Sequence, residues 1–307
     1  KNDEAHELQK LIIKEDIAGS WLTNRRTEIE FPSWVKIRGI EESGKKNISG
    51  DVNYSYDRTG NKVELTFDKS DTTKKSEIEL TFFVSVEADA TGDIVANVSG
   101  KAIDEEHKIV LGKAVAPIEV TTDVKDVRIG VQKQELGKIT LTENMAGAFK
   151  KGGDVEVTLD KDTRWTEDPV VKVVDGEGLK IDRVKTKDSK LSFRIVRESD
   201  KPATIEISGI EVDLYRTLPE GELRVFIGGR ALVENDNSNY SNYPVGGIGE
   251  MPSEDQFEYA TFKTDWVAEP VVAKVVTPAD QDTTGKEVVL TIGERTMFVD
   301  GVSETAN

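Results

Sequence analysis

The chain carries few side chains that could perform covalent or transition-metal chemistry. It has no cysteine and only two histidines, His6 and His107. A serine triad needs an imidazole base beside its nucleophile, and common zinc or copper sites need several His or Cys ligands. Neither histidine has such a context. The sequence therefore predicts a protein that is not an enzyme and holds no resident cofactor. A polysaccharide-active enzyme stays a third alternative, because none of the 58 acidic residues is singled out as a carboxylate pair.

Oxygen-rich loops are the remaining candidates for a metal site. Glu234 and Asp236 lie in the run ENDNSN, and Asp280 and Asp282 lie in a second acidic turn. Carboxylate and amide oxygens are the ligands that Ca²⁺ prefers. Neither loop has the spacing of an EF-hand. A bound Ca²⁺ is thus one hypothesis for these four residues, and solvated turns are the other.

Composition narrows the class of partner and the location. The formal net charge is -17, from 58 acidic and 41 basic residues, which disfavours nucleic acid and anionic membranes as partners. No apolar run approaches the roughly 20 residues of a membrane span. The start at Lys1 fits a processed secreted protein, although a trimmed chain would look the same. Together with the absence of cysteine, these features predict an extracellular protein at a cell surface.

The elements that would carry any site occur twice in the sequence. Lys10–Phe31 aligns without a gap on Lys138–Leu159, and Gly92–Ile103 aligns on Gly221–Leu232. The shared features include a glutamate followed by an Ala-Gly-aromatic turn, and alternating apolar positions. Two matches at offsets of 128 and 129 indicate a duplicated domain, which is typical of tandem surface or scaffold proteins.

Period-2 alternation of apolar residues dominates both copies, so the fold class is predicted to be all-β. Turn-rich spacers between short strands favour two tandem Ig-like β-sandwiches, with a C-terminal β-strand or hairpin beyond them. The predicted strands are Leu11–Glu15, Thr27–Phe31, Val35–Arg38, Val52–Tyr56, Lys62–Phe67, Glu77–Val86, Asp93–Val98, Pro117–Thr121, Ile139–Thr142, Asp154–Leu159, Val170–Val174, Leu179–Val184, Lys190–Ile195, Thr204–Val212 and Glu222–Ile227.

The domain plan follows from the repeat and from the places where the copies differ. We expect an N-terminal arm at residues 1–10, a first sandwich at 11–130, a second at 131–284, and a C-terminal extension at 285–307. Val124–Lys138 has little Gly or Pro and predicts a stiff joint. The second copy alone carries a long insertion, 235–257, in which Tyr240 and Tyr243 are candidate contact residues.

The tail Glu287–Gly301 reads EVVLTIGERTMFVDG. It resembles the opening of the copper-amine-oxidase N-terminal-like module found in secreted proteins of Firmicutes. The resemblance implies no copper chemistry, but it implies the company of repetitive β-domains in cell-surface proteins. The repeat itself resembles, in pattern, the sandwich units of bacterial surface-layer proteins and adhesins.

These features predict an extracellular structural protein that assembles with copies of itself into a surface layer or filament. A terminal β-segment that lacks a partner in its own chain can complete a sheet edge in a neighbour. The candidate interface residues are Leu11 and Ile13 near the start, and Val289, Leu290 and Phe298 near the end. Cell-wall polymers are possible further partners. The alternative hypothesis is an adhesin or carbohydrate-binding module that uses the 235–257 loop.

Overall fold

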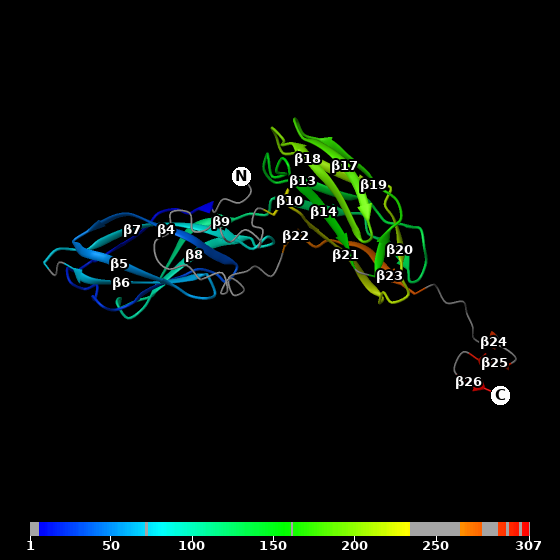
Figure 1. Ribbon diagram of the computed structural model, residues 1–307, viewed down its shortest axis with the longest axis horizontal. Coiled ribbons are helices and arrows are strands. Elements are labelled where there is room, and N and C mark those ends of the chain that lie inside the picture. The colour runs from blue at the N-terminus through cyan, green and yellow to red at the C-terminus, as the bar shows by residue number, and fades with distance from the viewer. Residues whose placement is uncertain are drawn as a thin grey trace.

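The computed structural model describes residues 6–70, 73–160, 162–233, 265–277, 288–292, 295–300 and 303–306. All secondary-structure elements in these ranges are β-strands. The strands form two β-sandwiches followed by a small C-terminal sheet (Figure 1). The all-β fold class and its tandem plan are as predicted. In this described part of the chain, no helix is long and apolar enough to cross a membrane.

The first sandwich packs two antiparallel sheets around one core. In one sheet, β7 (Glu77–Val86) pairs with β4 (Val35–Lys46) on one side, and with β1 (His6–Glu7) and β2 (Leu11–Lys14) on the other. The second sheet has the order β5 (Ile48–Tyr56), β6 (Lys62–Ser70), β3 (Thr27–Glu30), β8 (Gly92–Ser99) and β9 (His107–Ala114). Inward-facing side chains alternate along each strand, as period-2 patterning requires, and they form the first core.

The second sandwich has the same plan. One sheet has the order β10 (Ile118–Thr122), β13 (Ile139–Glu143), β19 (Thr204–Ser208) and β16 (Val170–Asp175). The other has the order β11 (Lys125–Arg128), β23 (Val271–Val276), β21 (Gly221–Gly228), β14 (Asp154–Leu159), β18 (Lys190–Arg197) and β17 (Lys180–Lys187), and β22 (Trp266–Ala268) pairs with β21. A small sheet of β12 (Gln134–Glu135), β20 (Glu211–Leu214) and β15 (Thr163–Trp165) closes one end.

The duplication extends to the register of the strands. In the first sandwich, Ile29 of β3 lies opposite Val63 and Val98. In the second, Val157 of β14 lies opposite Leu191 and Ile227. These partners differ by 128 or 129 positions, as the sequence alignment does. Conserving a register keeps the same residues on the core face, because a slip of one position would turn every side chain over.

The C-terminal sheet is a meander of three strands: β24 (Val288–Ile292), β25 (Arg295–Asp300) and β26 (Ser303–Ala306). The predicted C-terminal hairpin is therefore present, and it has a third strand. Val289 lies opposite Phe298, and Leu290 lies opposite Met297.

The predicted border between the sandwiches, at residues 130 and 131, is wrong. β10 and β11 precede it in the sequence but pair with β13 and β23 of the second sandwich, and Ile118 and Val127 belong to the second core. Val124–Lys138 is thus an integral part of that sandwich and not a joint. The connection is Val115–Pro117, three residues between the end of β9 and the start of β10.

The N-terminal arm also differs from the prediction over its described residues. β1 pairs with β7, and Leu8 lies in the first core. Residues 6–10 are therefore part of the first sandwich. Elsewhere, β9 was not predicted as a strand. The predicted strand Thr204–Val212 is divided into β19 and β20, because Gly209 has a positive φ of 63° that interrupts the extended backbone.

Candidate functional site

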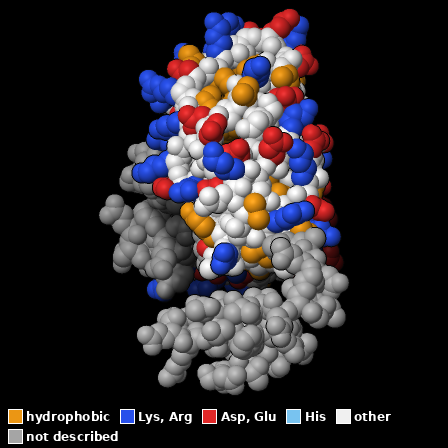
Figure 2. Space-filling view, turned by 90° about the vertical axis from the view of Figure 1, so that its right-hand side faces the viewer, with side chains coloured by type: hydrophobic (Ala, Val, Ile, Leu, Met, Phe, Trp, Pro, Cys, Tyr) orange, Lys and Arg blue, Asp and Glu red, His pale blue; other side chains and the backbone are white. Residues whose placement is uncertain are grey.

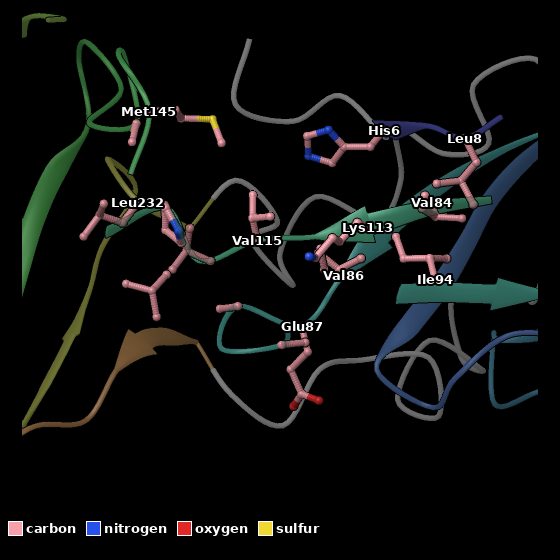
Figure 3. A pocket seen from close by; sticks show the side chains of 18 of the residues that line it. His6, Leu8, Val84, Val86, Glu87, Ile94, Lys113, Val115, Met145 and Leu232 are labelled. Atoms are coloured by element: carbon pink, nitrogen blue, oxygen red, sulfur yellow. The ribbon is translucent and has the colours of Figure 1, made fainter. Parts of the chain in front are cut away.

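A concave recess lies between the two sandwiches. It has a volume of about 540 Å³ and lies beside the three-residue connection (Figure 3). The first sandwich supplies the end of β7 with the turn after it, the end of β9, and the segment from His6 to Gln9. The second supplies the turn at residues 145–148 and the residues on both sides of the insertion, Leu232, Val233 and Val267.

The walls of the recess are mainly apolar. Leu8, Val84, Val86 and Ile94 line the first sandwich's side, and Met145 and Leu232 lie on the opposite wall, with Val115 between them (Figure 3). Met145 is 48% exposed, so the recess leaves much of its side chain uncovered. Charged lining residues include Glu87 and Lys113 of the first sandwich and Lys150 of the second. Apolar walls with a few charged groups, at this volume, match the usual character of ligand pockets.

The turn that presents Met145 is fixed by a buried carboxylate. Glu143 is 3% exposed and accepts hydrogen bonds from the Phe149 N–H at 2.9 Å, the Ala203 N–H at 2.8 Å and the Ser199 hydroxyl. Gly147 takes a positive φ of 73° within the turn. Because the carboxylate satisfies donors from the turn itself and from the connection between β18 and β19, it locks the turn onto the body of the sandwich.

The first sandwich contains the same device. Glu15 is buried and accepts hydrogen bonds from the N–H groups of Trp21 and Ser76, both at 2.7 Å. The glutamate and the Ala-Gly-aromatic turn that align in the two repeats are therefore a structural capping motif. Its repetition explains why this stretch matches better than the rest of the sequence.

Asn144 ties the connection between the sandwiches to this turn. Its backbone N–H donates to the Pro117 carbonyl at 3.0 Å, and its side-chain amide donates to the Ala116 carbonyl at 2.9 Å. Residues 144 and 145 thus act as a pair: one holds the connecting strand, and the other lines the recess.

A second ordered polar group lies at the far end of the second sandwich. Arg164 donates to Asp213 at 2.6 Å, and the Lys133 N–H donates to the same carboxylate at 2.9 Å. The hydrogen bond from Arg164 lowers the pKa of Asp213 below its ordinary value, and the backbone donor adds to this effect. These bonds join β15, β20 and the chain after β11, so their role is to hold that end together.

The predicted interface residues are distributed differently from the expectation. Leu11 is 3% exposed and belongs to the first core, and Ile13 packs against that core. β2 has a partner within the chain, since Leu11 lies opposite Leu80 of β7. The expectation that this strand lacks a partner is wrong. Val289, Leu290 and Phe298 lie in β24 and β25, which pair with each other.

The other predicted site residues lie outside the described residues. These are the contact residues Tyr240 and Tyr243, and the candidate calcium ligands Glu234, Asp236, Asp280 and Asp282. Over the ranges that the structure describes, no group of three His, Cys, Asp or Glu residues is placed to hold a metal ion. His107 begins the exposed end of β9, and His6 lines the recess.

The recess itself was missed by sequence reasoning. Its walls come from segments separated by up to 261 positions, from His6 to Val267, so no local pattern reveals it. The one available signal was Met145, an apolar residue in an otherwise small and polar turn.

Comparisons with known proteins give a structural likeness only. No protein-family model matches the chain, and no curated protein matches it; the resemblance of the tail to the copper-amine-oxidase module stays a prediction. The chain is similar to the C-terminal domain of the AgI/II polypeptide BspA of Streptococcus agalactiae, with 12% identity, 74% of this chain and 88% of that chain covered, and a TM-score of 0.29.

Two other solved structures are similar at the same level. For the collagen adhesin of S. aureus, identity is 11%, coverage is 74% of this chain and 82% of that chain, and the TM-score is 0.23. For a C-terminal fragment of the major pilin of Streptococcus agalactiae, the values are 11%, 74%, 80% and 0.26. Likeness at these scores carries no functional argument.

Proposed function

We propose that the chain is an extracellular, non-enzymatic structural protein of a cell surface that assembles with copies of itself. The observation that carries this proposal is the stacking of two sandwiches, end to end across a three-residue connection, whose equivalent strands keep the same order. Repeated units joined in this way build extended particles, in which each unit contacts its neighbours in the series.

The surface of the second sandwich carries charges of both signs, which suits a protein that does not bind nucleic acid or membranes. Lys and Arg side chains alternate with Asp and Glu over the side seen in Figure 2, and apolar side chains form small groups between them. Mixed charge of this kind supports solubility and leaves short-range contacts to decide association. The net charge of -17 adds repulsion that falls as salt screens it.

The C-terminal meander is the strand donor in this proposal. β24 and β26 are its outer strands, in the order β24, β25, β26. An outer strand offers backbone N–H and C=O groups along one edge, which can pair with a sheet edge of a neighbouring molecule. β24, which contains Val289 and Leu290, has the more β-prone sequence of the two.

The test is sedimentation velocity and negative-stain electron microscopy over a range of protein concentrations. We expect the full chain to form filaments or sheets, and a variant ending at Thr277 to assemble less, because it lacks the meander. A full chain that stays monomeric at every concentration would refute self-assembly. Unchanged assembly of the truncated variant would exclude the meander as donor and leave self-assembly standing.

The second candidate function is an adhesin that binds a ligand at the recess. The specific observation is that Leu232, Val233 and Val267, the described residues on either side of the 235–257 insertion, all line the recess. Two variants test it on a panel of cell-wall polysaccharides and matrix proteins: Met145→Lys, and replacement of 235–257 by a Gly-Ser linker. Loss of binding in both, with assembly unchanged, supports the adhesin; binding that neither alters excludes it.

A further inference from the structure

The joint between the sandwiches identifies which ends of this fold face another sandwich. The second sandwich presents the turn after β13, where Asn144 bonds the connection and Met145 lines the recess. The first sandwich uses the turn that follows β7, including Glu87 and Ala90. Because the two sandwiches share one topology, each of these surfaces has a counterpart in the other sandwich. The counterparts are the two outer poles of the molecule.

The counterpart of the Asn144–Met145 turn is Asp16 and Ile17, at the offset of 128 positions. β2 runs from the recess, where the neighbouring His6 lies, to the opposite end of the first sandwich, where Lys14 lies opposite Glu77. Ile17 follows at that end and is 71% exposed, more than any other large apolar residue that the structure describes. The Asp16 side chain is also fully exposed, with a loose contact of 3.5 Å to Lys75.

The counterpart of the turn after β7 is the turn between β20 and β21, which contains Tyr215 and Arg216. β23 ends at this same pole, where the Thr277 N–H donates to Glu220. Tyr215 is 44% exposed and Arg216 is exposed. The hydrogen bond between Arg164 of β15 and Asp213 of β20 lies next to this turn and holds the strands at this pole together.

We propose that the Asp16–Ile17 pole of one molecule docks on the Tyr215–Arg216 pole of a second copy. This inference rests on the proposed self-assembly and names its contact surface. The contact brings together, between molecules, the same two ends of the fold that face each other at the joint within one. Ile17 packs against Tyr215, as an apolar pair excluded from water. Asp16 accepts hydrogen bonds from the Arg216 guanidinium, which adds a charged pair to the contact.

Docking of this kind joins two different poles, so a docked pair keeps one free pole of each type. A head-to-tail contact that does not close on itself produces an open filament. The outgoing chain after Thr277 then starts beside the first sandwich of the next copy, within reach for the meander to add its own contact. Burial of Ile17 in the contact lowers the protein concentration at which filaments form by roughly five- to thirtyfold.

The absence of cysteine permits a direct test. Single-cysteine full chains carrying Ile17→Cys and Tyr215→Cys, with tags of different size, are mixed and treated with a short bis-maleimide. We expect the mixed dimer to form several-fold faster than in a control mixture of Ile12→Cys with Tyr215→Cys. Ile12 is 50% exposed on the outer face of β2, away from the pole. Equal rates in the two mixtures would overturn the proposed contact.

Substitution gives a second measurement on the same poles. We expect Asp16→Arg or Arg216→Asp alone to raise the assembly concentration about tenfold, and the chain carrying both to recover. Filaments that form normally in both single variants would refute the pole contact while leaving self-assembly in place. A wild-type chain that never assembles, together with cysteine variants that never cross-link, would refute both proposals.

Discussion

The buried glutamate of each sandwich offers a sharp test of the capping motif. In Glu143→Gln, the side chain keeps its shape but exchanges one carboxylate oxygen for an NH₂ group. One amide oxygen can still accept from the Phe149 N–H. The new NH₂ then faces the Ala203 N–H, where two donors oppose each other, and it can only donate to the Ser199 hydroxyl.

The magnitude follows from the bonds that are lost. A hydrogen bond to a charged group contributes about 1.5–3 kcal/mol, and a buried donor left without a partner costs about 1–3 kcal/mol. Glu143→Gln loses one such bond in full and weakens the other two. We therefore expect the free energy of unfolding of the second sandwich to fall by about 2–3 kcal/mol, and by about 3–5 kcal/mol in Glu143→Ala, where every donor loses its partner.

Hydrogen exchange with mass spectrometry measures this change separately for each sandwich, across a urea series. The two cores share no buried residue, so protection should fall in β13, β14 and β19 and stay unchanged in β2 and β7. Glu15→Gln is the reciprocal variant and should weaken the first sandwich instead. Glu156→Gln, which removes a partly exposed partner of Lys190, is the control, with an effect within about 0.5 kcal/mol.

Two results would refute this reasoning. If Glu143→Gln stays within about 0.5 kcal/mol of the wild type, the carboxylate does not hold the turn. If it weakens both sandwiches equally, they do not unfold as separate units, and the assignment of one motif to each core is wrong.

Three further predictions follow from contacts described above. Leu11→Ala should lower the free energy of unfolding of the first sandwich by about 2–4 kcal/mol in urea titrations, because Leu11 is a core residue; the exposed Ile12→Ala should change it by less than about 0.5 kcal/mol. Asp213→Asn should be less stable than the wild type at pH 7, and the difference in free energy of unfolding should narrow below about pH 4. The pKa of Asp213 is lowered mainly by Arg164, so the stabilisation from the ionised carboxylate is present above the unfolded-state pKa and is lost as pH falls. Parallel acid titration curves for the two proteins would contradict this. Gly137→Ala should cost about 3 kcal/mol or more in thermal unfolding, since its Cβ would lie 1.6 Å from a backbone carbonyl oxygen.

Strand positions could be predicted from the sequence because they depend on local alternation. β3, β6, β7 and β14 match their predicted ranges closely, since apolar side chains at every second position identify a half-buried strand. The duplication was visible for the same reason. β9 was missed because its pattern is weak: only two of its eight residues are buried.

The border of the second sandwich could not be predicted in this way. β11 is assigned to that sandwich by its pairing with β23, about 150 positions later in the chain. Such a pairing leaves no mark on the composition of Lys125–Arg128. The recess depends on the same long-range geometry. By contrast, the alignment of the two repeats identified the capping glutamates, although the sequence did not show which groups they bind.

The pairing of β11 with β23 has a mechanical consequence. These strands run parallel over four residue pairs, Lys125–Arg128 with Ala273–Val276. The chain enters the second sandwich at the joint and leaves β23 at the opposite pole, so a pull along the molecule draws the two strands past each other. Their hydrogen bonds then bear the load together, in shear, and do not open one at a time. Tension along the second sandwich is therefore resisted by the whole β11–β23 ladder at once.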